Sequence, residues 1–293
     1  MRIGVVGLGR MGAASAARLQ EVGHELVVWN RSADKTKPLV DAGAQAAASP
    51  AELAGKVDAI LSILTDANAI ETVYRGQGGL LSAELRGKLI IEMSTVQPET
   101  EVKLADDVRR IGGAFVECPV GGTVMPARTG KLIGLAGGEA GDVARARPIL
   151  DQLCRRLEHV GPVGAGASMK LAINLPLLVF YQALGEAVTL CRHLGHDPKW
   201  LMEFFADTSG GPNILKVRGP AIAEALAGGN PAAAFDVESI RKDLRTMVAE
   251  GKKLGASLPL AERTLAVYDE ASKDGWDSRD GASLPAYWPS RQG

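Results

Sequence analysis

The order of secondary-structure signals along this chain constrains its fold more than any other feature of the sequence. Up to about residue 163, short apolar runs alternate with helical stretches such as 97–111 and 141–153. This alternation is typical of βαβ units, whose mainly parallel sheet is covered by helices on both faces. The sequence therefore predicts an α/β domain with a doubly wound parallel sheet, with strands at residues 2–6, 25–29, 57–64, 88–93, 114–118, 131–136 and 156–160.

The rest of the chain carries helical signals alone. Apolar residues recur at helical spacing from 165 to about 194, and Gly and Pro residues separate the segments that follow. The sequence thus predicts a sheet domain over 1–163, a long interdomain helix over 164–194 and an all-α C-terminal domain over 195–293. Helices of this last domain are expected at 198–206, 220–227, 236–254 and 258–273.

Composition excludes several classes of protein. Hydrophobic residues make up 46% and charged residues 23% of the chain, which is typical of globular proteins and not of disordered or fibrous ones. Lys and Arg number 33 against 34 Asp and Glu, so the basic balance of a nucleic-acid-binding protein is absent. The odd number and wide spacing of the cysteines argue against a disulfide framework and predict a cytoplasmic location; they are Cys118, Cys154 and Cys191.

One segment has the apolar character of a membrane span. Residues 171–191 are largely apolar, but polar residues and a proline interrupt them, which favours a buried helix over a membrane-spanning one. We therefore expect no membrane contact. The interrupting residues are Asn174, Pro176, Gln182 and Glu186.

A glycine motif lies directly between the first predicted strand and the first predicted helix. G-x-G-x-x-G in this position gives a tight turn, close approach of the backbone to a pyrophosphate and close packing of helix on strand. The N-terminus of the helix adds N–H donors and a positive dipole. The motif predicts a Rossmann-type dinucleotide-binding domain, with a structural glycine turn as the alternative; its residues are Gly7, Leu8, Gly9, Arg10, Met11 and Gly12.

The end of the second predicted strand indicates which dinucleotide binds. NAD enzymes usually carry an acid there that accepts hydrogen bonds from the adenosine ribose. This chain instead has Asn30, Arg31 and Ser32 after Trp29. Arg31 can form a bidentate pair with a 2′-phosphate, and Ser32 can donate to it. The sequence predicts NADP as the cofactor, with dual use of NAD as the alternative.

A lysine stands near the start of the long predicted helix. Lys170 and Asn174 are one helical turn apart and share a face. Burying a lysine between two domains lowers its pKa toward a catalytically useful range. The alternative is a lysine whose charged end reaches solvent.

Five motifs, taken in their order along the chain, resemble those of the β-hydroxyacid dehydrogenases. This family includes 3-hydroxyisobutyrate dehydrogenases, tartronate semialdehyde reductases and glyoxylate/succinic semialdehyde reductases. The resemblance covers essentially the whole chain. Its motifs are the glycine run 7–12, Met93-Ser94-Thr95, Glu117-Cys118-Pro119-Val120-Gly121-Gly122, the run 166–174 and Lys242-Asp243.

The resemblance implies roles for individual residues. Leu64 and Thr65, at the end of the third predicted strand, match backbone contacts to the cofactor. Ser94 matches a substrate contact and Thr95 a contact near the nicotinamide ribose. In the second half of the chain, Lys170 matches the catalytic lysine, Asn174 its helper and Lys242 a lysine that reaches the cofactor; Asp243 matches a partner for one of these charges, with a surface ion pair as the alternative.

The substrate loop departs from the family pattern. The family usually has Asp-Ala-Pro-Val-Ser-Gly-Gly, where the serine and the glycine amides hold the substrate carboxylate. Here Gly121 stands in place of that serine, followed by Gly122 and Thr123. The loop can still present N–H groups, so we expect these three residues to bind a small carboxylate, while the identity of the substrate stays open.

Other candidate residues are weaker. Cys191, His193 and His196 lie at one helix end but offer only three ligands, so no metal site is predicted. Cys118 is expected to be a small buried residue, and His24 and His159 have no partner identifiable from the sequence.

Together these features predict an NADP-dependent oxidoreductase with its active site in the cleft between the domains. Hydride would pass between nicotinamide C4 and the carbonyl carbon of a small β-hydroxy acid or aldehyde acid, with Lys170 as general acid and base. The resemblance implies a homodimer or homotetramer. Two alternatives stay open: an imine reductase of the same fold, in which the lysine is usually replaced, and a catalytically silent NADP-binding protein.

Overall fold

A computed structural model describes residues 1–291 of the chain. The chain divides into two compact units, unit 1 over Met1–Leu171 and unit 2 over Ala172–Gly293. The division falls inside the long helix α8, Ala165–Cys191, whose first residues belong to unit 1.

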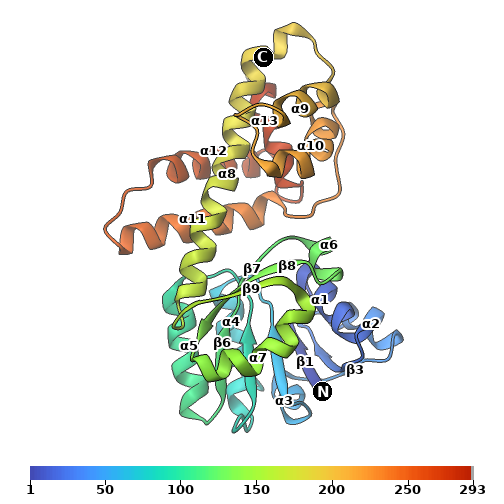
Figure 1. The fold of residues 1–293 in the computed structure, drawn as a ribbon, viewed down its shortest axis with the longest axis vertical. Coiled ribbons are helices and arrows are strands. Elements are labelled where there is room, and N and C mark those ends of the chain that lie inside the picture. Colours follow the sequence, from blue (N-terminus) through green and yellow to red (C-terminus); the bar gives the residue numbers. More distant parts are fainter. Residues whose placement is uncertain (292–293) are drawn as a thin grey trace. The chain divides into compact units, whose positions relative to one another are not determined.

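Unit 1 is built on one mainly parallel sheet (Figure 1). Its order is β3-β2-β1-β4-β5-β6-β8-β7, and β9 also pairs with β8. Only the β6–β8 and β7–β8 pairs are antiparallel. The strands are β1 (Arg2–Val6), β2 (Glu25–Trp29), β3 (Gln45–Ala46), β4 (Ala59–Ser62), β5 (Leu89–Glu92), β6 (Ala114–Glu117), β7 (Val120–Gly121), β8 (Leu132–Gly138) and β9 (Cys154–Gly161).

The strand order reverses between β1 and β4, because the chain first builds outward through β2 and β3 and then through β4, β5 and β6 on the other side. The register at this point pairs Ile3 with Leu26 on one side and with Ala59 on the other. Ligands of open α/β sheets bind outside the carboxyl ends of the strands at such a reversal. The sheet thus places its binding edge after Val6, Trp29, Ser62 and Glu92.

Helices cover both faces of this sheet because its strands alternate buried apolar side chains between two cores. Ile3 and Val5 face the core formed with α1, α2, α6 and α7, whereas Val6 and Val27 face the core formed with α3, α4 and α5. The doubly wound fold predicted from the sequence is confirmed. The helices are α1 (Arg10–Glu21), α2 (Lys37–Asp41), α3 (Pro50–Gly55), α4 (Ala67–Arg75), α5 (Pro98–Arg110), α6 (Val124–Arg128) and α7 (Ala140–Leu153).

The described residues of unit 2 form helices joined by turns and loops, with one isolated bridge between Asp236 and Asp280. Asp280 is fully buried and accepts hydrogen bonds from Ala234 N (2.7 Å) and Ala282 N (2.8 Å), which ties the segments before α11 and α13 together. The helices after α8 are η3 (Arg192–Leu194), α9 (Pro198–Ala206), α10 (Asn213–Leu226), α11 (Val237–Lys253), α12 (Pro259–Lys273), η4 (Gly281–Ser283) and α13 (Leu284–Ser290).

The predicted start of one of these helices is wrong. The sequence places it at Pro220, whereas α10 begins at Asn213 and runs through the proline. Pro220 is exposed, so the backbone hydrogen bond that proline cannot donate is missing on the solvent side of the helix.

By length and composition, the segment Ala165–Leu194 is long and apolar enough to cross a membrane. An 18-residue window within it has a mean hydropathy of 1.5, and 44% of that window is buried inside the protein. A core helix meets the same criteria.

Candidate active site

The glycine motif forms a tight turn between β1 and α1. Gly7 has φ +90°, and a Cβ there would lie 2.2 Å from the Ile63 carbonyl oxygen; a Cβ on Gly12 would lie 1.9 Å from the Gly7 oxygen. Gly9, by contrast, is exposed, and a Cβ there would meet nothing within 4 Å. Two glycines therefore permit close packing, and the third leaves room for a ligand against the backbone.

The N-terminus of α1 is suited to an anion. Within the described chain no side chain caps this end, and its first turn holds no acidic residue. Backbone N–H groups and the positive end of the helix dipole therefore face the open side of the turn. Of the motif's other residues, Leu8 is buried, Met11 packs on the core and Arg10 is exposed.

Asn30 joins this turn to the end of β2. Its Oδ1 accepts from Leu8 N at 2.8 Å, and its Nδ2 donates to Ser32 O at 3.0 Å. Arg31 and Ser32 are exposed on the segment that Asn30 holds. The structure therefore brings the predicted phosphate loop and the predicted 2′-phosphate residues to one corner of the sheet.

A buried polar cluster links the ends of β4 and β5. The fully buried carboxylate of Glu92 accepts from the Ser62 hydroxyl and from Ser94 N (2.7 Å), and Ser62 Oγ lies 2.6 Å from Tyr74 Oη. Ser94 Oγ in turn accepts from Leu64 N at 2.7 Å. Burial raises the pKa of Glu92 to about 7, although hydrogen bonds from Ser62 and Ser94 oppose the shift.

This cluster brings together the predicted contacts near the nicotinamide. Leu64 is half-buried and Thr65 exposed at the end of β4; Ser94 is buried and Thr95 half-buried after β5. Since the Ser94 hydroxyl already bonds the Leu64 amide, it holds the two loops in register. Its direct contact with substrate stays a prediction.

A second buried carboxylate, Glu117, ends β6. It accepts hydrogen bonds from Gly164 N, Gly166 N and Ala167 N, where α8 begins. Burial raises the pKa of Glu117 to about 7, and the three amides oppose the shift.

The predicted substrate loop follows Glu117 directly. Gly121 lies in the short strand β7, Gly122 has φ +125°, and Thr123 stands before α6. A Cβ on Gly122 would lie 2.8 Å from Leu132 Cδ2, so a side chain there would be strained by the backbone conformation and would have to displace the end of the Leu132 side chain. The loop remains open to ligands, because Gly122 is exposed and Gly121 and Thr123 are half-buried.

Lys170 and Asn174 lie on one face of α8. Both are nearly buried, with exposed fractions of 8% and 7%. A buried ammonium is costly to desolvate and is normally satisfied by polar groups or used in chemistry. The helix therefore presents a sheltered lysine with an amide one turn further on.

In unit 2, Asp243 joins two of the predicted residues. Its Oδ2 accepts from Asn174 Nδ2 at 3.1 Å, and its Oδ1 lies 2.6 Å from Lys242 Nζ. Asp243 is only 2% exposed. Asp243 is therefore buried and not on the helix surface, and it contacts two of the residues predicted to act at the site; its role there stays a prediction.

The weaker candidates take structural positions. Among residues 1–291 no group of three His, Cys, Asp or Glu side chains is placed to hold a metal ion. Cys118 is fully buried, and burial raises its pKa. The structure shows partners that the sequence did not reveal for the two histidines. His24 Nε2 lies 2.6 Å from Gln152 Oε1 and His159 Nε2 lies 2.9 Å from Gly138 O, residues too distant in sequence to be identified from it.

Family comparisons cover nearly the whole chain. The family model for the NAD-binding domain of 6-phosphogluconate dehydrogenase matches residues 2–161, and that for NAD-binding of NADP-dependent 3-hydroxyisobutyrate dehydrogenase matches residues 164–288. The chain belongs to the NAD(P)-dependent β-hydroxyacid dehydrogenase family. The resemblance and the enzyme class inferred from the sequence motifs are confirmed.

Individual members of the β-hydroxyacid dehydrogenase family align over most of their length. Glyoxylate/succinic semialdehyde reductase 1 of Arabidopsis thaliana is 32% identical over 280 residues, which are 96% of each chain. A 3-hydroxyisobutyrate dehydrogenase of Pseudomonas aeruginosa is 34% identical over 261 residues, 88% of each chain. The crystal structure of 3-hydroxyisobutyrate dehydrogenase from Salmonella typhimurium shares the fold, with a TM-score of 0.88 at 24% identity over 98% of this chain and 99% of that one.

Two residues of this β-hydroxyacid dehydrogenase site were missed by sequence reasoning. Glu92 and Glu117 each end a buried apolar strand; Glu92 lies two positions before Ser94, and Glu117 lies four positions before Gly121. A carboxyl group at the end of a buried strand needs a nearby hydrogen-bond donor. This requirement is the signal in the sequence that could have identified both glutamates.

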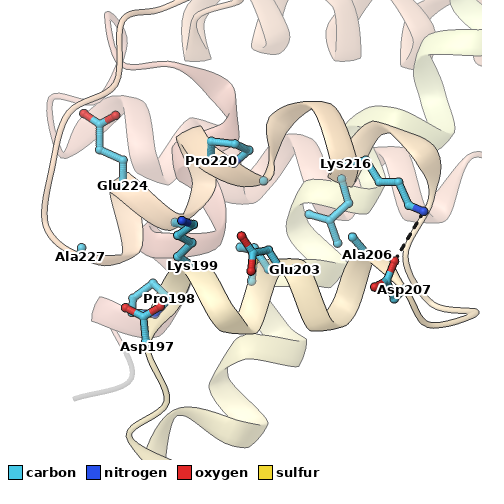
Figure 2. Close-up of a pocket in the computed structure, with 14 residues that line it drawn as sticks. Asp197, Pro198, Lys199, Glu203, Ala206, Asp207, Lys216, Pro220, Glu224 and Ala227 are labelled. Atoms are coloured by element: carbon cyan, nitrogen blue, oxygen red, sulfur yellow. Dashed lines mark ion pairs between the residues drawn. The ribbon is translucent and has the colours of Figure 1, made fainter.

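A cavity of about 550 Å³ lies elsewhere, between α9 and α10 of unit 2 (Figure 2). Its lining includes the buried apolar residues Met202, Leu215 and Ala223. Lys216 and Asp207, which also line it, form an ion pair with 3.5 Å between Nζ and Oδ1. Its lining residues all fall within 197–227 and include none of those predicted to bind cofactor or substrate.

Proposed function

We propose that this dehydrogenase interconverts a small β-hydroxy acid and its aldehyde acid with NADP(H), of the 3-hydroxyisobutyrate, tartronate semialdehyde, glyoxylate or succinic semialdehyde type. The observation that carries the proposal is the nearly buried Lys170, 8% exposed, with Asn174 one turn along the same face of α8. This pair supplies a sheltered proton donor and an uncharged helper.

The residues of unit 1 fit a dinucleotide. Gly9 leaves open space against the backbone, and the N-terminus of α1 offers N–H donors to a pyrophosphate. Exposed Arg31 and Ser32, on the segment that Asn30 ties to the glycine turn, would hold a 2′-phosphate, which favours NADP over NAD. Lys242, paired with Asp243, would add a positive charge for the cofactor.

The loop at Gly121, Gly122 and Thr123 would hold the substrate carboxylate. Gly122 is exposed and carries no side chain, so a small ligand can approach its backbone, and Thr123 adds a hydroxyl. Ser94 would contact the substrate, and Thr95 would lie near the nicotinamide ribose. Backbone and hydroxyl donors can hold a carboxylate where water is excluded.

When bound, the nicotinamide supplies or accepts the hydride. In reduction, Lys170 holds a proton at Nζ and donates it to the carbonyl oxygen as negative charge develops there; in oxidation, the neutral amine accepts it. Asn174 orients the ammonium or the substrate oxygen without adding charge. Asp243 fixes the Asn174 amide by accepting its N–H.

The direct test is a spectrophotometric panel of small aldehyde acids and hydroxy acids with both cofactors, run on wild type and Lys170→Met. Positioned acid–base groups contribute about 10²–10⁴-fold, so the variant should lose at least about 10²-fold in kcat. Binding of NADPH, followed by nicotinamide fluorescence, should change little. Near-normal turnover by Lys170→Met would refute the assigned chemistry. Equal turnover of uncharged aldehydes or cyclic imines would refute the substrate class.

A second copy of the chain is the proposed macromolecular partner, in a homodimer or homotetramer, and we propose a cytoplasmic location without nucleic-acid or membrane contact. Large apolar side chains are exposed at the end of α8, in η3 and along α9. They include Leu190 (80%), Leu194 (56%) and the stacked rings of Trp200 and Phe204, whose centroids are 5.1 Å apart. Such surfaces usually pack against another protein. Light scattering coupled to gel filtration should show at least a dimer, and Trp200→Glu should weaken it.

A further inference from the structure

The carboxylate of Glu117 binds the start of α8 through three backbone amides. Its Oε1 accepts from Gly164 N at 2.5 Å and Gly166 N at 2.8 Å, and its Oε2 accepts from Ala167 N at 3.1 Å. Glu117 is fully buried, so these bonds are shielded from water. One side chain from the sheet thus satisfies several N–H groups that a helix start leaves without intrahelical partners.

Glycines make the room for this carboxylate. A Cβ on Gly137 would lie 2.3 Å from Glu117 Oε1, and a Cβ on Gly166 would lie 3.2 Å from the same atom. Gly164 has φ +99°, a conformation that other residues rarely adopt. The space that holds the Glu117 carboxylate therefore depends on backbone conformation and on the absence of side chains at glycines of two segments, β8 and the start of α8.

Glu117 lies between the two parts of the proposed site that must act together. It is the last residue of β6, and the chain continues directly from it into the substrate loop. The amides that it holds belong to the first turn of α8, and Lys170 follows Ala167 by less than one helical turn. A negative charge at this end also interacts favourably with the helix dipole.

We propose that Glu117 is a positioning residue of this dehydrogenase: by holding the first turn of α8 against the end of β6, it sets where Lys170 Nζ lies relative to the substrate loop. The inference rests on the proposed role of Lys170. A misplacement of about 1 Å can cost on the order of 10²-fold in rate, so a small shift of the helix start would be felt in turnover.

Glu117→Gln is the decisive variant. Its amide oxygen can replace Oε1, but its NH₂ group then faces the Ala167 N–H, so one bond becomes a donor–donor contact and the charge is lost. The variant should remain folded well above pH 7. Burial already raises the pKa of Glu117 to about 7 and thus favours an uncharged side chain at this position. Glu117→Asp keeps the charge on a shorter side chain and should lie between wild type and Gln.

We expect a loss of kcat without a loss of affinity for the cofactor. At pH 8, Glu117→Gln should lose about 10- to 100-fold in kcat, while the Kd for NADPH stays close to wild type and urea unfolding still shows one cooperative transition. Hydrogen exchange at residues 164–168 should accelerate. Asp197→Asn is the matched control, because Asp197 also caps a helix, accepting from Trp200 N at 2.9 Å, and α9 carries no predicted site residue; its kcat should not change.

A double-mutant cycle separates positioning from an independent effect. If Glu117 acts through Lys170, adding Glu117→Gln to Lys170→Met should cause little further loss. Multiplicative losses, or a folded Glu117→Gln enzyme with wild-type kcat, would overturn the inference. Normal turnover by Lys170→Met alone would instead overturn the proposed function, and the exchange measurement would still report whether Glu117 holds the helix.

Discussion

Asn174 and Asp243 are joined by a buried hydrogen bond of 3.1 Å from Nδ2 to Oδ2, across 69 positions of sequence. Because an ionised carboxylate can only accept, this contact fixes which end of the Asn174 amide faces Asp243. The amide oxygen then points away from Asp243 and is oriented as an acceptor. A helper for a lysine ammonium needs such an oriented oxygen.

Asn174→Ala should lower kcat, but less than Lys170→Met does. Proton transfer survives in the variant, whereas the orientation of the lysine or the substrate suffers. The variant also leaves Asp243 Oδ2 without its buried donor, which should cost about 1–3 kcal/mol of unfolding free energy. Steady-state kinetics and urea unfolding test both parts. A loss in kcat as large as that of Lys170→Met would show that Asn174 itself takes part in the proton transfer.

Arg31→Ala should weaken the binding of NADPH but not that of NADH. A charge-assisted bidentate pair with a 2′-phosphate is worth about 1.5–3 kcal/mol, so the Kd for NADPH should rise roughly tenfold or more while that for NADH stays nearly unchanged. Lys37→Ala is a nearby control, because the lysine is exposed and pairs with Asp41 at 2.9 Å. Equal weakening of both cofactors in Arg31→Ala would contradict the assignment.

Features that depend on neighbours in sequence could be predicted before the structure. The turn from β1 into α1, the strand ends near Leu64 and Ser94, and the shared face of Lys170 and Asn174 all follow from local spacing. Apolar runs and Gly positions report such features directly. The very short strands β3 and β7 were missed because two residues give no periodicity.

The contacts that organise the site could not be predicted in the same way. Glu92 meets Ser62 across 30 positions, and Glu117 meets Gly164 across 47. Each pair depends on which strands are neighbours and in which register, and a sequence pattern leaves both open. Strand order places β4 beside β5, and the pairing of β6 with β8 brings Glu117 opposite Gly137.

Stability should fall as pH rises through neutrality, in part because of Glu117. Its pKa is raised from 4.5 to about 7 in the folded protein, so the folded state binds a proton more tightly than the unfolded state. The corresponding stability is fully present below about pH 4.5 and is lost as pH passes 7; it amounts to about 3 kcal/mol at most. Urea unfolding at pH 5.5 and 8 should show a smaller pH dependence for Glu117→Gln than for wild type. An unchanged difference between the two pH values would contradict the shift.

Glu101 offers a way to stabilise the protein. This α5 residue is 1% exposed, and neither carboxyl oxygen has a hydrogen-bond partner among the described residues. Burial, followed by the charges of Glu92 and Glu117, raises its pKa well above the usual range, so keeping it ionised is costly. Removing a buried polar group that lacks a partner is stabilising when the replacement fills the same space.

Glu101→Met should therefore increase the unfolding free energy by about 1–3 kcal/mol, with the larger gain at alkaline pH, where the wild-type carboxyl is closest to ionising. Glu99→Met is the control on the same helix, because Glu99 is exposed and forms an i,i+4 pair with Lys103 at 2.6 Å that is worth only a few tenths of a kcal/mol. Urea unfolding at pH 6 and 9 measures both variants. A destabilised Glu101→Met protein would mean that the carboxyl finds hydrogen-bond partners in solution, through water or a shift of its neighbours. Its burial would then not destabilise the protein.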